Sequence, residues 1–132
     1  MMEHEFTPLI EGTLEGWRMA GRGSFSLRGG EVLENAGGPG IFWYTLQAFP
    51  DFLLRVEWRV SREEDNSGIF VRCPALGSSD PVNDWKPAVE QGYEIQIDDK
   101  GHNHELGRLG DPQCLTGAVY KLAPALKLAS QP

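Results

Sequence analysis

Apolar and polar residues alternate strictly along residues 52–60, and this pattern predicts a long β-strand with one buried face. Successive side chains of a strand point to opposite faces, so the alternation divides the segment into two rows. The apolar row contains Phe52, Leu54, Val56, Trp58 and Val60. The opposite row contains Leu53, Arg55, Glu57 and Arg59. We expect the apolar row to pack in a core and the charged row to form the other face of a sheet.

Residues 67–73 and 92–98 carry the same alternation. If the three strands share a sheet, their polar rows gather on one face. That face then contains Arg55, Glu57, Arg59, Phe70, Arg72, Glu94, Gln96 and Asp98. Arginine and carboxylate groups bind hydroxyls, and an aromatic ring packs on the face of a sugar. Such a surface suits a hydroxyl-rich ligand.

A solvated sheet face is the alternative interpretation of the row formed by Glu94, Gln96 and Asp98. Exposed faces of antiparallel strands are polar by default, and the three residues alone favour that simpler reading. A turn at residues 99–101 follows directly, however, and it delivers His102 and His104 next to the row. The two histidines favour a functional site.

The chain as a whole predicts an all-β fold of two packed antiparallel sheets. Its 16 Gly and 9 Pro separate short alternating runs, as in proteins with many strands and tight turns. Gly29 and Gly30, between two such runs, predict the two-residue turn of a hairpin. No helix of three turns is indicated. The predicted core contains Phe52, Val56, Trp58, Ile69, Val71, Ile95 and Ile97.

Composition narrows the class of protein. A chain of 132 residues is expected to form a single domain over residues 1–132. Its 12 basic and 19 acidic residues give a net charge of -7 without a basic cluster, which argues against nucleic acid as a partner. No stretch approaches the ~20 apolar residues of a membrane span, and the first residues do not resemble a secretion signal, so the localisation is left open. Cys73 and Cys114 allow either a disulfide or two thiols.

Residues 74–88 are rich in Gly, Ser, Asp, Pro and Asn and also contain Trp85. Irregular loops of this length in compact domains are usually either functional lids or disordered excursions. Trp85 favours the lid, because an aromatic side chain needs a surface to pack on, and we expect it to contact the ligand.

Five segments of the chain, in their order and spacing, resemble the 3-keto-disaccharide hydrolase domain. They are residues 12–17, 51–59, 66–72, 92–98 and 116–120. The resemblance covers nearly the whole chain. It implies a concanavalin-like jelly roll, as in lectins and glucanases, and cleavage of glycosides already oxidised at C3. It also implies a carbohydrate partner, in proteins that are often secreted or periplasmic.

The chain departs from the family pattern at its C-terminal end. Members of the family continue beyond the segment that resembles residues 116–120 into further strands, whereas this chain stops at Pro132. It resembles the front two-thirds of the domain. Missing strands would leave open sheet edges, so we expect either a homodimer or poorly ordered residues from about Leu122 onward.

The spacing of the acids disfavours an ordinary glycosidase mechanism. Glu94 and Asp98 lie four strand residues apart, or ~13 Å, which is too far for the carboxylate pair of a retaining or inverting enzyme unless Glu57 approaches from a neighbouring strand. The resemblance implies a 3-keto sugar, whose ketone acidifies the C2 hydrogen. The glycosidic oxygen can then leave by elimination, and water adds afterwards. This reaction needs one base, one group that stabilises the enolate and one acid.

The predicted catalytic residues are Glu94 or a histidine as the base, Arg72 or a bound cation at the enolate oxygen, and Tyr120 or a histidine such as His102 as the acid. The predicted substrate contacts are Glu57, Arg59, Phe70, Trp85, Gln96 and Asp98. His102 and His104 with Asp98 or Glu94 are also a candidate divalent-metal site, because imidazole and carboxylate suit such ions. A His-x-His pair after a turn is, however, more often simply exposed.

A non-catalytic carbohydrate-binding module is the competing function, because jelly rolls host both. A flat platform of Phe70, Trp85 and Tyr93 indicates binding. An enzyme is indicated instead if Arg72, Glu94, Asp98 and His102 converge in one pocket.

Overall fold

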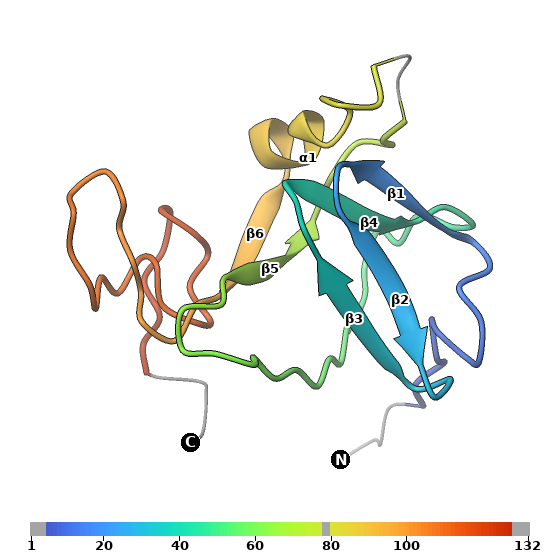
Figure 1. Ribbon diagram of the computed structural model, residues 1–132, viewed down its shortest axis with the longest axis horizontal. Coiled ribbons are helices and arrows are strands. Elements are labelled where there is room, and N and C mark those ends of the chain that lie inside the picture. The colour runs from blue at the N-terminus through green and yellow to red at the C-terminus, as the bar shows by residue number, and fades with distance from the viewer. Residues whose placement is uncertain (1–4, 78–79, 128–132) are drawn as a thin grey trace. The chain divides into compact units, whose positions relative to one another are not determined.

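The computed structural model describes residues 5–77 and 80–127, which form six strands and one short helix (Figure 1). The strands pair two by two, and all three pairs are antiparallel. The fold is therefore all-β, as the sequence predicts. The chain divides into two compact units, one of residues 1–50 with 75–85 and one of residues 51–74 with 86–132.

The first unit contains two antiparallel strand pairs. Strand β1 (Trp17–Gly21) pairs with β4 (Gly40–Tyr44), and β2 (Ser24–Arg28) pairs with β3 (Val32–Ala36). Residues 29–31 join β2 to β3, because the register pairs Arg28 with Val32. Gly29 and Gly30 have φ angles of 61° and 74°, which favour glycine. The predicted hairpin is confirmed, but its loop has three residues and not the predicted two.

Stacked aromatic rings hold the two pairs of the first unit together. The ring of Phe42 on β4 stacks on Phe25 of β2 at 4.7 Å and on Trp17 of β1 at 5.1 Å between centroids. The β1–β4 and β2–β3 pairs thus share one aromatic cluster. Such contacts add about 0.5–1.5 kcal/mol each beyond the area that they bury.

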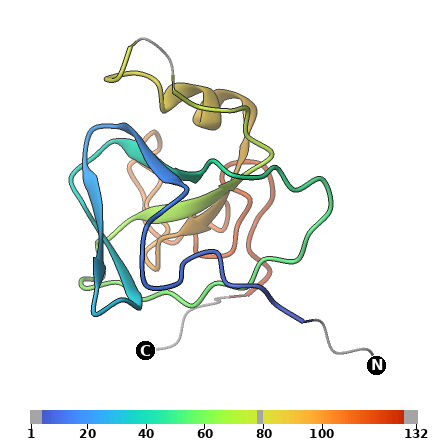
Figure 2. The ribbon, with the colours of Figure 1, turned by 90° about the vertical axis from the view of Figure 1, so that its right-hand side faces the viewer.

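The second unit is built around strand β6 (Tyr93–Ile97), which pairs with β5 (Ser67–Val71) (Figures 1 and 2). Helix α1 (Lys86–Gln91) leads into β6, so residues 86–88 are helical where the sequence predicts an irregular loop. On the other edge of β6, residues 116–120 run alongside. The backbone N–H groups of Gly117 and Tyr120 donate to carbonyl oxygens of β6, and that of Thr116 donates to the carbonyl oxygen of Asp98, directly after β6. In the other direction, the N–H of Gln96 donates to the carbonyl oxygen of Ala118. This segment pairs with β6 but does not form a regular strand.

Residues 52–60 form no strand, so the predicted long strand is wrong. The predicted sheet face that includes Arg55, Glu57 and Arg59 is consequently wrong as well. A strand exists only where its backbone groups are paired, and alternation says nothing about where the pairing partner comes from. Phe52 and Val56 remain 43% and 44% exposed, so neither belongs to the core.

The two rows of β6 also differ from the prediction. Gln96 and Asp98, from the polar row, are each 2% exposed. In the apolar row Ile97 is buried, but Ile95 is only half-buried and Tyr93 is exposed. Ile69, Val71 and Trp58 are likewise half-buried. Much of the polar row is therefore covered by the chain itself.

Among residues 5–77 and 80–127, no helix is long and apolar enough to cross a membrane.

Candidate functional site

Glu94 lies half-buried on β6, with its side chain across Gly68 of β5. A β-carbon built on Gly68 would come 2.3 Å from Oε1 and 2.6 Å from Cγ of Glu94. Phe70 stands directly opposite Glu94 in the register of the two strands, on the same face. The missing side chain at residue 68 thus makes the space in which the carboxylate lies.

Burial changes the acidity of this group. Desolvation raises the pKa of Glu94 from 4.5 to about 7. Within the described part of the chain, no hydrogen bond or ion pair engages its carboxylate. The oxygens of Glu94 are therefore available to take a proton near neutral pH.

Tyr120, one of the predicted acids, lies on the segment that pairs with β6 at Glu94. Its backbone N–H donates to the carbonyl oxygen of Glu94 at 2.9 Å, so the two residues lie side by side on paired segments. Burial, with smaller contributions from nearby acidic groups including Glu94, raises the pKa of the Tyr120 phenol. The hydroxyl consequently stays protonated at neutral pH and remains a proton donor.

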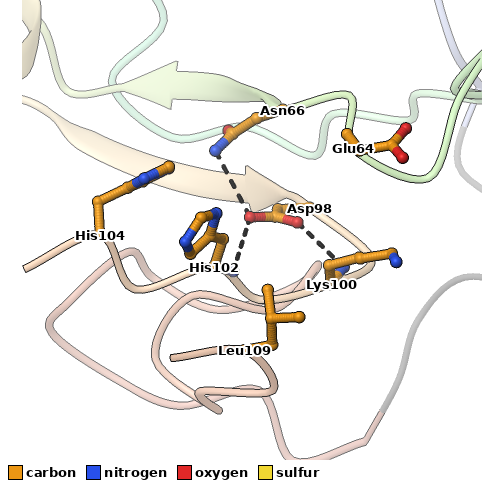
Figure 3. A pocket seen from close by; sticks show the side chains of 7 residues that line it. All are labelled: Glu64, Asn66, Asp98, Lys100, His102, His104 and Leu109. Atoms are coloured by element: carbon orange, nitrogen blue, oxygen red, sulfur yellow. Dashed lines mark hydrogen bonds between the residues drawn. The ribbon is translucent and has the colours of Figure 1, made fainter. Parts of the chain in front are cut away.

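Asp98 follows β6 directly and continues the row of Glu94, but its carboxylate oxygens accept hydrogen bonds from other residues of the chain. Oδ1 accepts the backbone N–H groups of Lys100 at 3.0 Å and Gly101 at 3.1 Å, and Oδ2 accepts that of His102 at 3.0 Å. The amide of Asn66 donates to Oδ2 at 3.5 Å. Asp98 thus orders the turn that presents the histidines (Figure 3).

An open cavity of about 250 Å³ lies beside this turn. It is lined by Glu64, Asn66, Asp98, Lys100, His102, His104 and Leu109 (Figure 3). The rings of His102 and His104 lie 3.8 Å apart between centroids. Lys100 also forms an ion pair with Glu63, with 3.1 Å between Nζ and Oε2. The cavity therefore offers hydrogen-bonding groups and two imidazoles to a ligand.

The predicted convergence of four residues in one pocket is only partly present. Asp98 and His102 line the cavity together, whereas Glu94 and Arg72 are absent from its lining. Arg72 follows the last residue of β5 with a φ angle of 58°, and its guanidinium lies 5.7 Å from the ring centroid of Phe52. Two neighbouring groups of residues therefore share the β6 region, one around Glu94 and one around His102.

The predicted substrate contacts are not gathered in one place. Glu57 and Arg59 are exposed on the segment that forms no strand, and Gln96 is buried. Trp85 belongs to the first unit, where its indole N–H donates to the carbonyl oxygen of Val82 at 3.0 Å. Phe70 and Tyr93 point to opposite faces of the β5–β6 pair, because Phe70 is opposite Glu94 and not Tyr93. The two rings cannot share a flat platform.

Asn66 is a cavity residue that the sequence prediction missed. It stands two residues before Gly68, in the phase of Phe70, so continuing the strand register would place it opposite Asp98. That signal is present in the alternation. Lys100 and Leu109 carry no comparable sequence signal, because irregular loops bring them to the cavity.

The described residues contain no group of three or more His, Cys, Asp or Glu side chains arranged to hold a metal ion. The metal site of His102, His104 and Asp98 stays a prediction without structural support. Cys73 and Cys114 are both free thiols, so the two are not joined in a disulfide.

Replacing Asp98 with Asn should destabilise the protein by about 2–3 kcal/mol, because an amide NH2 would then face backbone donors that now meet a carboxylate oxygen. Unfolding in urea measures the change, and amide exchange at residues 100–102 should accelerate. Asp99→Asn is the matched control, since Thr116 is the one residue in the described part of the chain that donates a hydrogen bond to the Asp99 carboxylate. Equal stability of the two variants would refute the role of Asp98.

Replacing Gly68 with Ala should push the Glu94 carboxylate out of its space and lower its pKa from about 7 towards 4.5. Gly68 lies in β5 without a positive φ angle, so alanine fits its backbone and the effect falls on Glu94. NMR titration of the carboxyl carbon measures the pKa. Ser67→Ala, an exposed position on the same strand, is the control. An unchanged pKa in Gly68→Ala would contradict this geometry.

Comparison with known proteins gives one result. The family model of the 3-keto-alpha-glucoside-1,2-lyase-like domain matches residues 5–132. No curated protein and no solved structure matches the chain. Because the match extends over nearly every residue, including β5, β6 and the turn after Asp98, the chain belongs to the 3-keto-alpha-glucoside-1,2-lyase-like family.

Proposed function

We propose that the protein cleaves 3-keto-glycosides by elimination across C1 and C2, with Glu94 as the base that removes the C2 proton. The observation that carries this proposal is the half-buried Glu94 carboxylate, which lies over Gly68 and has a pKa of about 7. A base works best when its pKa is near the working pH, because it is then both ionised and strong. The lyase-like description of the family agrees with this chemistry.

The reaction proceeds in balanced steps. Glu94 takes the C2 proton, and the electron pair of the C–H bond forms an enolate with its charge on the C3 oxygen. Arg72 donates hydrogen bonds to that oxygen. The enolate then collapses, a C1–C2 double bond forms, and the glycosidic oxygen leaves with a proton from Tyr120. Water adding across the double bond, with its oxygen on C1 and a proton on C2, gives the free 3-keto sugar.

The adjacency of Tyr120 and Glu94 supports the assignment of the acid. The two are joined by a backbone hydrogen bond, and burial keeps the phenol protonated at the pH where Glu94 ionises. His102 is the alternative acid. It lines the cavity beside Asp98, with its ring against His104, so it belongs to the neighbouring group of residues.

The cavity beside β6 is the proposed place for the leaving group. It lies on the Asp98 side of the face that carries Glu94, and a second sugar there would meet the amide of Asn66 and the two imidazoles. A carbohydrate-binding module is less well supported, because Phe70 and Tyr93 lie on opposite faces.

Replacing Glu94 with Gln should lower kcat on a 3-keto-glucoside by about 10²–10⁴-fold while substrate binding is largely retained, because the amide keeps the shape and loses the basic lone pair. Glu90→Gln, at an exposed position of α1, is the matched control and should keep full activity. Turnover of Glu94→Gln at the parent's rate rejects Glu94 as the base. A parent that binds the sugar without cleaving it supports the binding module instead.

The pH dependence provides a further test. Only ionised Glu94 can accept a proton, so kcat/KM should rise with pH through about 7 and level off above it. The folded pKa is raised, so the folded state holds this proton more tightly than the unfolded chain does between pH 4.5 and 7. The contribution of Glu94 to stability is therefore lost as pH rises through that window. Glu94→Gln should gain stability over the parent at pH 8 and less so at pH 5, as thermal unfolding at both pH values would measure.

A further inference from the structure

Lys121, the residue after the proposed acid Tyr120, has a backbone conformation that residues other than glycine rarely adopt. Its φ angle is 59°, in the left-handed region. The N–H of Lys121 donates to the carbonyl oxygen of Gln113 at 3.0 Å, which holds the turn in place. Strain of this kind persists only where the surrounding structure maintains it, and it is concentrated at functional sites. A lysine where glycine would fit more easily therefore calls for a role of its side chain.

The turn places the Lys121 ammonium against two groups of the same unit. Nζ lies 5.4 Å from the centroid of the Tyr120 ring. It also forms an ion pair with Oε1 of Glu105 at 2.5 Å. Glu105 belongs to the loop that follows β6, so the ion pair joins two segments that are distant along the chain. Two simultaneous contacts restrict a lysine side chain that is otherwise flexible, and they hold its charge beside the phenol.

We propose that Lys121 is a positioning residue that holds the Tyr120 phenol and stabilises the phenolate formed when Tyr120 gives its proton to the leaving group. The inference rests on the proposed elimination, in which Tyr120 is the acid. A cation is attracted to an aromatic ring, and the attraction strengthens once the ring carries a negative charge. Lys121 therefore stabilises the state after proton transfer more than the state before it, and only such a difference accelerates the step.

The same contact serves the second half of the reaction. When water adds to the C1–C2 double bond, the phenolate takes one proton from the water, and the hydroxide oxygen bonds to C1. The proton held by Glu94 goes to C2, so Glu94 and Tyr120 both return to their starting states. The ammonium of Lys121 preserves the phenolate as the base for this step.

The charges around Tyr120 support this role. Burial is the largest influence on the phenol and raises its pKa, and the Lys121 ammonium is the largest influence in the opposite direction. Cys114, Glu94 and Glu105 add smaller upward effects on the same pKa. A buried phenol beside acidic groups is a weak acid, so the cation offsets part of what its surroundings cost.

Replacing Lys121 with Met removes the charge at similar side-chain length and should raise the pKa of Tyr120, whereas Lys121→Arg should keep it near the parent's. NMR titration of the Tyr120 ring carbon Cζ, in protein labelled at tyrosine, measures this without any substrate. Lys127→Met removes another exposed lysine and is the matched control, which should leave the pKa of Tyr120 unchanged. An unchanged pKa in Lys121→Met overturns the inference.

Kinetics on a 3-keto-glucoside test the catalytic consequence. Lys121→Met should lower kcat about 2–5-fold with KM little changed, because an exposed cation–ring contact has about this strength. The fall of kcat/KM at alkaline pH should move to higher pH, since the protonated form of Tyr120 then persists further. Lys121→Arg should restore most of the rate.

Lys121→Gly separates this role from a purely structural one. Glycine adopts a φ angle of 59° freely, so the variant should resist urea about as well as the parent and still lose activity as Lys121→Met does. An active parent whose kcat is unchanged in both variants overturns the inference and leaves Glu94 as the base. A parent that cleaves no 3-keto-glucoside instead overturns the proposed function, and the catalytic role of Lys121 with it.

Discussion

The carboxylate of Asp98 is the anchor on which the architecture beside β6 depends. Three consecutive backbone N–H groups, those of Lys100, Gly101 and His102, converge on its two oxygens. A buried carboxylate is tolerated only when such donors replace its water, and these donors belong to the turn that carries the histidines. The side chain and the turn therefore require each other. This mutual requirement places the imidazoles beside the cavity.

The carboxylate of Asp111 orders the chain around it in the same way. Asp111 accepts hydrogen bonds from the side chains of Asn103 and Arg108 and from the backbone of Gln113, and these donors hold its pKa below the usual range. Residues 99–115 thus keep a defined path with almost no regular structure. Acids in this part of the chain replace the hydrogen-bonded ladders that order strands elsewhere.

The sequence predicts features that arise from neighbouring residues better than features that arise from distant ones. The Gly29–Gly30 hairpin and strands β5 and β6 follow from turn chemistry and period-two alternation, both of which are local. Alternation also assigned Glu94, Gln96 and Asp98 correctly to one row. It could not reveal that this row is covered, because the covering loops are ordered by Asp98 itself. Residues 52–60 have the strongest strand pattern, yet a strand needs a partner, and no local signal supplies one.

Glu94 and Asp98 show how one strand face can give two acids different tasks. Asp98 has its lone pairs filled by backbone donors, so it is available for structure and not for proton transfer. Glu94 sits over a glycine, next to an aromatic residue and without donors among the described residues, so desolvation alone sets its pKa. Desolvation of the ionised carboxylate destabilises the folded protein. The same desolvation makes Glu94 a stronger base than an exposed carboxylate. Gly68 is thus as much a part of the proposed base as the carboxyl group, since any larger residue there would return Glu94 to water.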